Sequence, residues 1–207
     1  MTRRLEEARQ ASIYGVRPRR SFRQAATKYL EEHQHKRSIG DDALHLRQLD
    51  PFIGSLPLAS VHAGTLRPFI DARRRQGRKA KTINLALGIV RHIHNLAAFE
   101  WLDEHNLTWL TTPPKIKLLK VEDAHEPYPL SWDEQAGLFR ELPAHLGRMA
   151  LFKVNTGCRD REVCGLKWEW EVLIPELETS VFVIPGTRVK NGDERLVVLN
   201  RVARSVI

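Results

Sequence analysis

The spacing of the apolar residues changes once along the chain, near Trp170. Before that point apolar residues recur about every three or four positions, as they do on one face of a helix, and the longest such stripe runs from Ile83 to Trp101. After it, residues 180–184 and 195–199 form β-branched apolar runs that are typical of strands. The change predicts a mainly α-helical fold with a small antiparallel β-sheet.

The part before the change contains four amphipathic segments between residues 21 and 110. Ser21, Thr65 and Thr82 are expected to cap the first, third and fourth helices. The second is interrupted at Asp50-Pro51, where the missing backbone donor is expected to bend or restart the helix. Short connections between such helices favour a bundle. We therefore expect a four-helix domain over residues 21–110, preceded by a basic segment, residues 1–20.

Residues 111–130 differ in composition from both neighbours, because prolines, threonines and lysines replace the apolar stripe. Such a segment cannot form a regular helix and is expected to be an interdomain linker. The sequence Ser-Trp-Asp-Glu at 131–134 then matches a capping box. It predicts a second domain, residues 131–207, that opens with a helix to about Leu142.

The rest of this second domain is expected to pass from helix to sheet. A further helix is predicted around residues 148–154, and residues 168–172 could add a third strand to the two β-branched runs. The pair Asn191-Gly192 lies between those runs and tolerates the positive φ angles of a tight hairpin.

The net charge of +8 is large for 207 residues and indicates a polyanionic partner. Much of the excess lies between residues 67 and 81, where only Asp71 is acidic. A solvated charged face would explain this run without any partner. We nevertheless expect it to bind double-stranded DNA through Arg67, Arg73, Arg74, Arg75, Arg78, Lys79 and Lys81.

Several other classes of protein lack support. No apolar run has the roughly 20 residues that span a bilayer, and the first residues do not resemble a secretory signal, so a cytoplasmic protein with no membrane partner is expected. The two cysteines, Cys158 and Cys164, predict neither a disulfide scaffold nor a zinc finger. No metal site and no small-molecule cofactor are expected.

Residues 156–162, Thr-Gly-Cys-Arg-Asp-Arg-Glu, form the motif most suggestive of chemistry. Gly157 allows a sharp turn that leaves Arg159 at the exposed start of a helix, with Glu162 one turn later on the same face. The arginine fork suits phosphate oxygens, and a neighbouring carboxylate can fix its orientation. An ordinary helix start with an Arg/Glu pair is the simpler alternative.

This motif, with Leu166 and Trp168 after it, resembles the first catalytic box of the tyrosine site-specific recombinases, or phage integrases, T-G-x-R-x-x-E. The resemblance implies a SAM-like core-binding domain over residues 21–110 and a partial α+β catalytic domain over residues 131–207. It implies catalytic roles for Arg159 and Lys190, with Glu162 supporting, and Lys190 in a hairpin would protonate the leaving 5′ oxygen of DNA. A solvated hairpin lysine is the alternative for that residue.

The family also needs a His-x-x-Arg box and a nucleophilic tyrosine after the hairpin lysine. Here all nine histidines and all three tyrosines precede Arg159. We therefore expect a polypeptide truncated before these motifs and inactive alone, because no residue can begin the covalent step. Its enzyme status stays open for that reason, and other recombinase protomers on DNA are further candidate partners. Arg195, Arg201 and Arg204 are expected to be strand-end and helix-surface charges.

Two other functions remain as alternatives. The first is a non-catalytic DNA-binding or interaction protein derived from an integrase, which the reading frame beyond Ile207 would distinguish from a recombinase of a phage or other mobile element. The second is a basic helical regulator unrelated to recombination. The pairs His33/His35 and His92/His94 are not expected to bind metal, since two-residue spacing on a helix separates the rings. Trp101 and Trp109 are expected to pack rather than to stack on bases.

Overall fold

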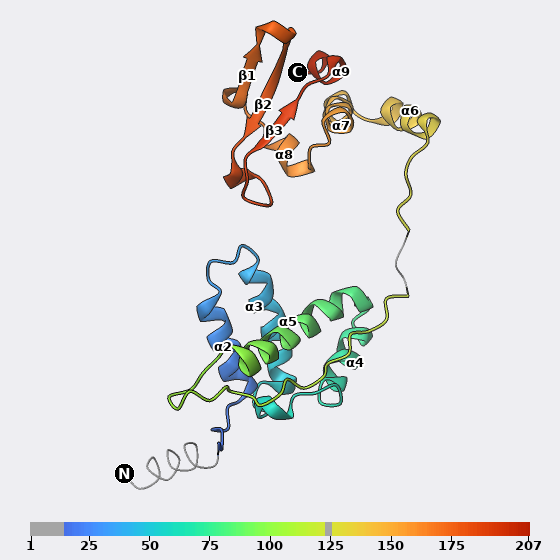
Figure 1. The fold of residues 1–207 in the computed structure, drawn as a ribbon. Helices are drawn as coiled ribbons and strands as arrows, with labels where there is room; N and C mark the ends of the chain where they lie inside the picture. The colour runs from blue at the N-terminus through green and yellow to red at the C-terminus, as the bar shows by residue number, and fades with distance from the viewer. Residues whose placement is uncertain (1–14, 123–125) are drawn as a thin grey trace. The chain divides into compact units, whose positions relative to one another are not determined.

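The computed structural model describes residues 15–122 and 126–207, and these fall into two compact units divided between Glu126 and Pro127 (Figure 1). Most of the expected basic segment, residues 1–14, lies outside the described residues. The prediction of a mainly helical fold with a small antiparallel sheet is confirmed.

The first unit is built from four α-helices, α2 (Phe22–Glu32), α3 (Ile39–Ile53), α4 (Arg67–Arg75) and α5 (Ala80–Phe99), with the short 3₁₀ helix η1 (Leu58–Ser60) between α3 and α4 (Figure 1). Helix α2 begins where Ser21 and Gln24 form a reciprocal capping box, so the expected cap is confirmed. Helix α5 supplies the centre of the core, because its apolar stripe from Ile83 to Ala98 is buried against the other helices.

Three details of these helices differ from prediction. Pro51 lies inside α3, which continues to Ile53, because the burial of Leu49 and Ile53 outweighs one missing backbone hydrogen bond. Helix α4 begins at Arg67, and the Thr65 hydroxyl instead closes the preceding turn by accepting from the backbone N–H of His62. Helix α5 begins at Ala80, two residues before the expected cap, and its N-cap residue is Lys79 in extended conformation.

Residues 111–122, within the expected linker, lie along the first unit. The side chain of Ile116 is 6% exposed and belongs to the core of that unit. The Asn84 side chain on α5 donates to the carbonyl of Leu119 and accepts from its backbone N–H, both at 2.8 Å. This part of the segment is thus attached to α5 by burial and by two hydrogen bonds.

The second unit begins with α6 (Trp132–Glu141), whose N-terminus is the predicted capping box of Ser131 and Glu134. Helices α7 (Ala144–Thr156) and α8 (Asp160–Cys164) follow, and α9 (Arg201–Ser205) comes after the sheet. The second helix is therefore longer than the predicted residues 148–154. Among the residues that the structure describes, no helix is long and apolar enough to cross a membrane.

The sheet of the second unit is antiparallel with strand order β1-β2-β3, formed by β1 (Glu171–Ile174), β2 (Thr179–Ile184) and β3 (Arg195–Val198). Strand β1 begins later than predicted, because residues 168–170 form the 3₁₀ helix η2 (Trp168–Trp170). Two further 3₁₀ helices, η3 (Pro175–Leu177) and η4 (Gly186–Arg188), lie in the β1–β2 and β2–β3 connections. One face of the sheet packs on α7 and α9. The buried core between the sheet and these helices includes Phe152, Phe182, Ile184, Val197, Leu199 and Ala203.

Candidate functional site

The predicted motif lies at the junction of α7 and α8. Helix α7 is followed by its C-cap residue Gly157, which has a left-handed φ of 64° that side-chain-bearing residues rarely adopt. The chain then turns back through Cys158, which is buried in the core of the unit. Arg159 follows in extended conformation as the N-cap residue of α8. The turn therefore places Arg159 at the start of a helix, as its sequence predicted.

Glu162, in the first turn of α8, is the centre of the site. Its side chain is only 2% exposed, and it accepts from the backbone N–H of Arg159 at 2.9 Å. Its Oε1 also accepts from Nη1 of Arg159 at 2.9 Å. The spacing of three residues brings the two side chains together, and the carboxylate holds the arginine from both its backbone and its side chain.

Arg195, the first residue of β3, joins the same carboxylate from the sheet. Its Nη1 donates to Oε2 of Glu162 at 2.7 Å, and its Nη2 donates to the carbonyl of Gly157 at 2.9 Å. Arg195 is a strand-end charge, as expected, but its contact with Glu162 was not expected. No local spacing signals this contact, because it depends on where β3 lies beside the α7–α8 turn.

The electrostatics of this arginine–glutamate cluster (Arg159, Glu162 and Arg195) favour an anion. Burial raises the pKa of Glu162, but hydrogen bonds from Arg159 and the charge of Arg195 outweigh it and hold that pKa below its ordinary value. One carboxylate then faces two guanidinium groups, which leaves a net positive charge. The Arg159 side chain is 50% exposed, and its Nε and Nη2 have no acceptor within the described residues. Those atoms can bind a phosphate.

Lys190 lies in the connection between β2 and β3 and is exposed. It makes no hydrogen bond or ion pair with Arg159 or Glu162 in the described parts of the chain. The connection is a ten-residue loop rather than a tight hairpin, and it includes η4. A Cβ on Gly186 would lie 2.0 Å from the carbonyl oxygen of Gly192, so the loop needs glycine there.

The predicted DNA-binding residues lie on the first unit, around the turn from α4 to α5. Arg73 donates to Gln76 at 2.7 Å and is partly buried, whereas Arg67 lies 3.9 Å from Asp71. The others are exposed. We call this set the α4–α5 basic surface: Arg67, Arg73, Arg74, Arg75, Arg78, Lys79 and Lys81.

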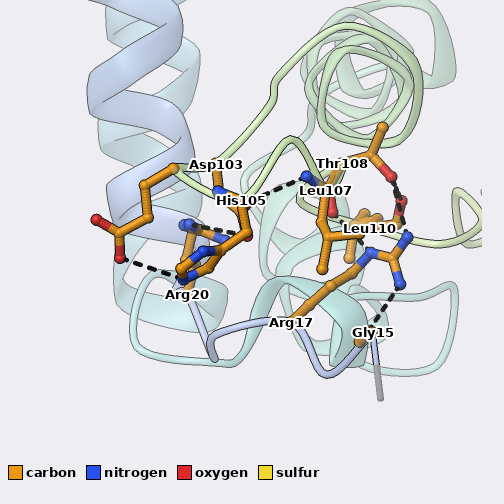
Figure 2. Close-up of polar contacts among 9 residues, drawn as sticks. Gly15, Arg17, Arg20, Asp103, His105, Leu107, Thr108 and Leu110 are labelled. Carbon is orange, nitrogen blue, oxygen red and sulfur yellow. Dashed lines mark hydrogen bonds and ion pairs between the residues drawn. The ribbon is translucent and has the colours of Figure 1, made fainter. Parts of the chain in front are cut away.

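Figure 2 shows a second group of arginines, in the segment before α2, whose charges serve the fold. Arg17 donates through Nε to the carbonyl of Thr108 at 2.7 Å. Arg20 lies 3.9 Å from the buried carboxylate of Asp103, with its guanidinium 4.4 Å from the ring centre of Trp109. These contacts attach residues 15–20 to the loop after α5, so Arg17 and Arg20 are structural.

The remaining candidates from the sequence have structural roles. Trp101 is buried and donates to Glu32 at 2.6 Å, as the packing interpretation expected. His94 is buried and donates to the carbonyl of Leu58. The rings of His33 and His35 were expected to be separated by helical spacing, but they stack with their centres 6.0 Å apart. The reason is that α2 ends at Glu32, before both residues. Across residues 15–122 and 126–207, no group of three potential ligands is arranged to hold a metal.

Comparison with known proteins gives structural matches only, since no family model and no curated protein sequence matches the chain. The integrase of transposon Tn1549, in complex with a circular intermediate DNA, matches 90% of this chain with a TM-score of 0.59 and 16% identity. The recombinase XerH, in a post-cleavage complex with palindromic difH substrate, matches 86% with a TM-score of 0.50 and 16% identity.

The matches extend over both units, but the chain spans only 63% of the Tn1549 integrase chain and 47% of the XerH chain. A second structure of the Tn1549 integrase with circular intermediate DNA gives the same TM-score, 0.59, at 17% identity. These likenesses show that the chain has the tyrosine recombinase fold.

Proposed function

We propose that these 207 residues bind duplex DNA as a site-specific recombinase polypeptide. Residues 21–110 would serve as the core-binding domain and residues 131–207 as part of the catalytic domain. Residues 111–130 would connect them, with residues 111–122 packed on the first unit. The observation that carries this proposal is the arginine–glutamate cluster, in which Glu162 holds Arg159 with two nitrogens left for a phosphate. The matched integrase and recombinase structures are complexes with DNA, which supports the same partner here.

The α4–α5 basic surface would supply most of the affinity. Its arginines and lysines are mostly exposed, and the surface holds seven cations beside one aspartate. Contacts of this kind bind the DNA backbone regardless of sequence and release counterions, so affinity falls as salt rises. The first unit would thus hold the DNA, and the second would bring the cluster to one phosphodiester.

At that phosphodiester, Arg159 would donate to the non-bridging oxygens. The guanidinium fork matches the spacing of two phosphate oxygens, and charge-assisted hydrogen bonds of this type strengthen as negative charge develops. Lys190 would deliver a proton to the leaving 5′ oxygen, a role that its exposed position in the β2–β3 loop permits.

The covalent step would need a residue from elsewhere. Each tyrosine of the sequence precedes Arg159, and Tyr128 adjoins the start of the second unit rather than following the cluster. We therefore propose that these residues alone form no covalent link to DNA. A second protomer that donates a tyrosine-bearing segment could complete the reaction.

A titration of fluorescently labelled duplex DNA with the full chain at several salt concentrations tests the binding. The expected result is a linear fall of log affinity with log salt, with a slope of about −0.9 for each phosphate bound. An affinity that does not change with salt, or the absence of binding at low salt, would overturn the proposal.

A further inference from the structure

Arg195 connects two parts of the candidate site that are far apart in sequence. It lies 33 residues from Glu162 and 38 from Gly157, and it donates to both, at 2.7 Å and 2.9 Å. These contacts link the first residue of β3 to the turn between α7 and α8. The strand and the motif turn are therefore held together by one side chain.

The two arginines of the cluster use their nitrogens differently. Arg195 commits both Nη1 and Nη2 to acceptors within the protein, and its side chain is 28% exposed. Arg159 commits Nη1 and its backbone N–H to Glu162, and its side chain is 50% exposed. A phosphate can therefore reach Arg159 more readily, whereas Arg195 faces the carboxylate and the turn.

We propose that Arg195 is a positioning residue that acts on DNA through Glu162 and Arg159; this inference rests on the proposed function. Arg195 donates to Oε2 of Glu162, which also accepts from the backbone N–H of Arg159, and this leaves Oε1 to the Arg159 side chain. These contacts fix the plane of the carboxylate. By donating to the carbonyl of Gly157, it also fixes the turn from which Arg159 projects. The phosphate-binding nitrogens of Arg159 are thereby held in one direction before DNA arrives.

The same contacts place the β2–β3 loop. Lys190 precedes Arg195 by five residues, and the loop between them ends where β3 begins. Because Arg195 fixes the start of β3 against the α7–α8 turn, it sets the range over which Lys190 can move relative to Arg159. One side chain would thus align both groups that the proposed function assigns to the phosphodiester.

A double-mutant cycle on the full chain tests this inference. Arg159→Gln, Arg195→Gln and the double variant are titrated with labelled duplex DNA at several salt concentrations. If Arg195 acts through Arg159, the first variant lowers affinity by about tenfold, the second by nearly as much, and the double variant by no more than the first. Each should also reduce the salt slope by about 0.9, because the same phosphate is no longer bound.

Two further variants and two further measurements separate positioning from charge and from folding. Arg161→Gln removes an exposed positive charge on the same helix and should leave affinity nearly unchanged. Arg195→Lys keeps the charge but cannot reach both acceptors, and should give an intermediate affinity. Amide exchange of Val197 and Phe182 reports whether the sheet is intact in each variant, and the Arg159 Nε–H signal in NMR should broaden or shift when Arg195 is replaced.

The outcomes distinguish the positioning role of Arg195 from the phosphate interaction proposed for Arg159. Decreases in affinity of the two single variants that add in the double variant would show that Arg195 acts independently and would overturn the inference. The inference would also be overturned if Arg159→Gln binds DNA weakly while Arg195→Gln or Arg195→Lys binds it with wild-type affinity. If Arg159→Gln itself binds as the wild type does, the phosphate interaction assigned to Arg159 in the proposed function is wrong. If the sheet is not intact in Arg195→Gln, the DNA affinity of Arg195→Lys tests the inference instead.

Discussion

The side chain of Asn84 on α5 pairs with the backbone of Leu119 through two hydrogen bonds, 35 residues apart in sequence, and both measure 2.8 Å. An asparagine amide that donates and accepts in this way imitates the pairing of neighbouring strands. It attaches residues 111–122 to the first unit, in a part of the chain whose prolines and lysines alone would predict a free linker. Lys115, Lys117 and Lys120 are carried on that segment.

Asn84→Ala should make this segment a better protease substrate. Removal of two partly buried hydrogen bonds, worth about 1 kcal/mol each, should raise local opening and the rate of trypsin cleavage after Lys117 or Lys120 by about tenfold or more. Mass spectrometry of a timed digest measures this. Asn95→Ala, at an exposed position on the same helix, is the matched control and should be cleaved at the wild-type rate.

The α4–α5 basic surface predicts a specific decrease in DNA binding. Replacing Arg73, Arg74 and Arg75 together with alanine should weaken binding to labelled duplex DNA. The slope of log affinity against log salt should become less steep by about 0.9 for each phosphate that is no longer bound. The matched variant replaces Arg19, Arg47 and Arg91, which are exposed on the same unit. It removes the same charge, so an equal effect of both variants would show a general charge effect instead of a binding surface.

Several features that depend on neighbours in sequence could be predicted, although the caps expected at Thr65 and Thr82 were wrong. The N-cap predicted at Ser21 and the capping box predicted at Ser131 need partners three residues away, and both form. The contact between Arg159 and Glu162 also follows from a three-residue spacing on a helix. The switch from helix to sheet near Trp170 follows from the apolar pattern, because periods of 3.6 and 2 bury different residues.

Features that depend on tertiary packing could not be predicted from the sequence. Pro51 stays helical because core packing on both sides of it outweighs the missing hydrogen bond. Arg195 joins the cluster because the register of β3 points it at the α7–α8 turn, which no spacing in sequence reveals. The arginines before α2 illustrate the same limit, since only the fold shows that Arg17 and Arg20 bind the loop after α5.

The cluster predicts a dependence of stability on pH. The folded-state pKa of Glu162 is below its ordinary value of 4.5, so its contribution is present above that value and is lost as pH falls through the folded pKa. Glu162→Gln removes the charge that both arginines contact. Near neutral pH it should destabilise the second unit by about 2 kcal/mol, the scale of hydrogen bonds to a charged group.

Amide exchange at Phe182 and Val197, followed from about pH 6 to about pH 3, measures this effect on the sheet. The difference between the wild type and Glu162→Gln should shrink toward the acidic end of that range. Glu194→Gln, which alters an exposed carboxylate beside Arg195, should follow the wild type throughout. A difference between the wild type and Glu162→Gln that stayed constant with pH would show that ionisation of Glu162 does not stabilise the fold.

The most consequential prediction is that these 207 residues form no covalent adduct with DNA, although Arg159, Glu162 and Lys190 are present. The reaction of a tyrosine recombinase begins when a tyrosine oxygen attacks the phosphodiester, and electrostatic stabilisation by arginine cannot replace a missing nucleophile. Tyr29 is buried and donates to Asp42 at 2.7 Å. Tyr128 is 74% exposed and donates to Glu134 at 2.5 Å, and this hydrogen bond raises its pKa, which disfavours the nucleophilic phenolate.

A suicide substrate, nicked beside the scissile phosphate so that cleavage cannot reverse, tests this under denaturing electrophoresis. A pool of nicked duplexes of varied sequence serves as the substrate. The expected result is salt-sensitive binding with no protein–DNA band that survives denaturation. A surviving band that disappears in Tyr128→Phe, and not in Tyr29→Phe, would identify Tyr128 as a nucleophile and show that the second unit can complete the covalent step without a tyrosine that follows the cluster.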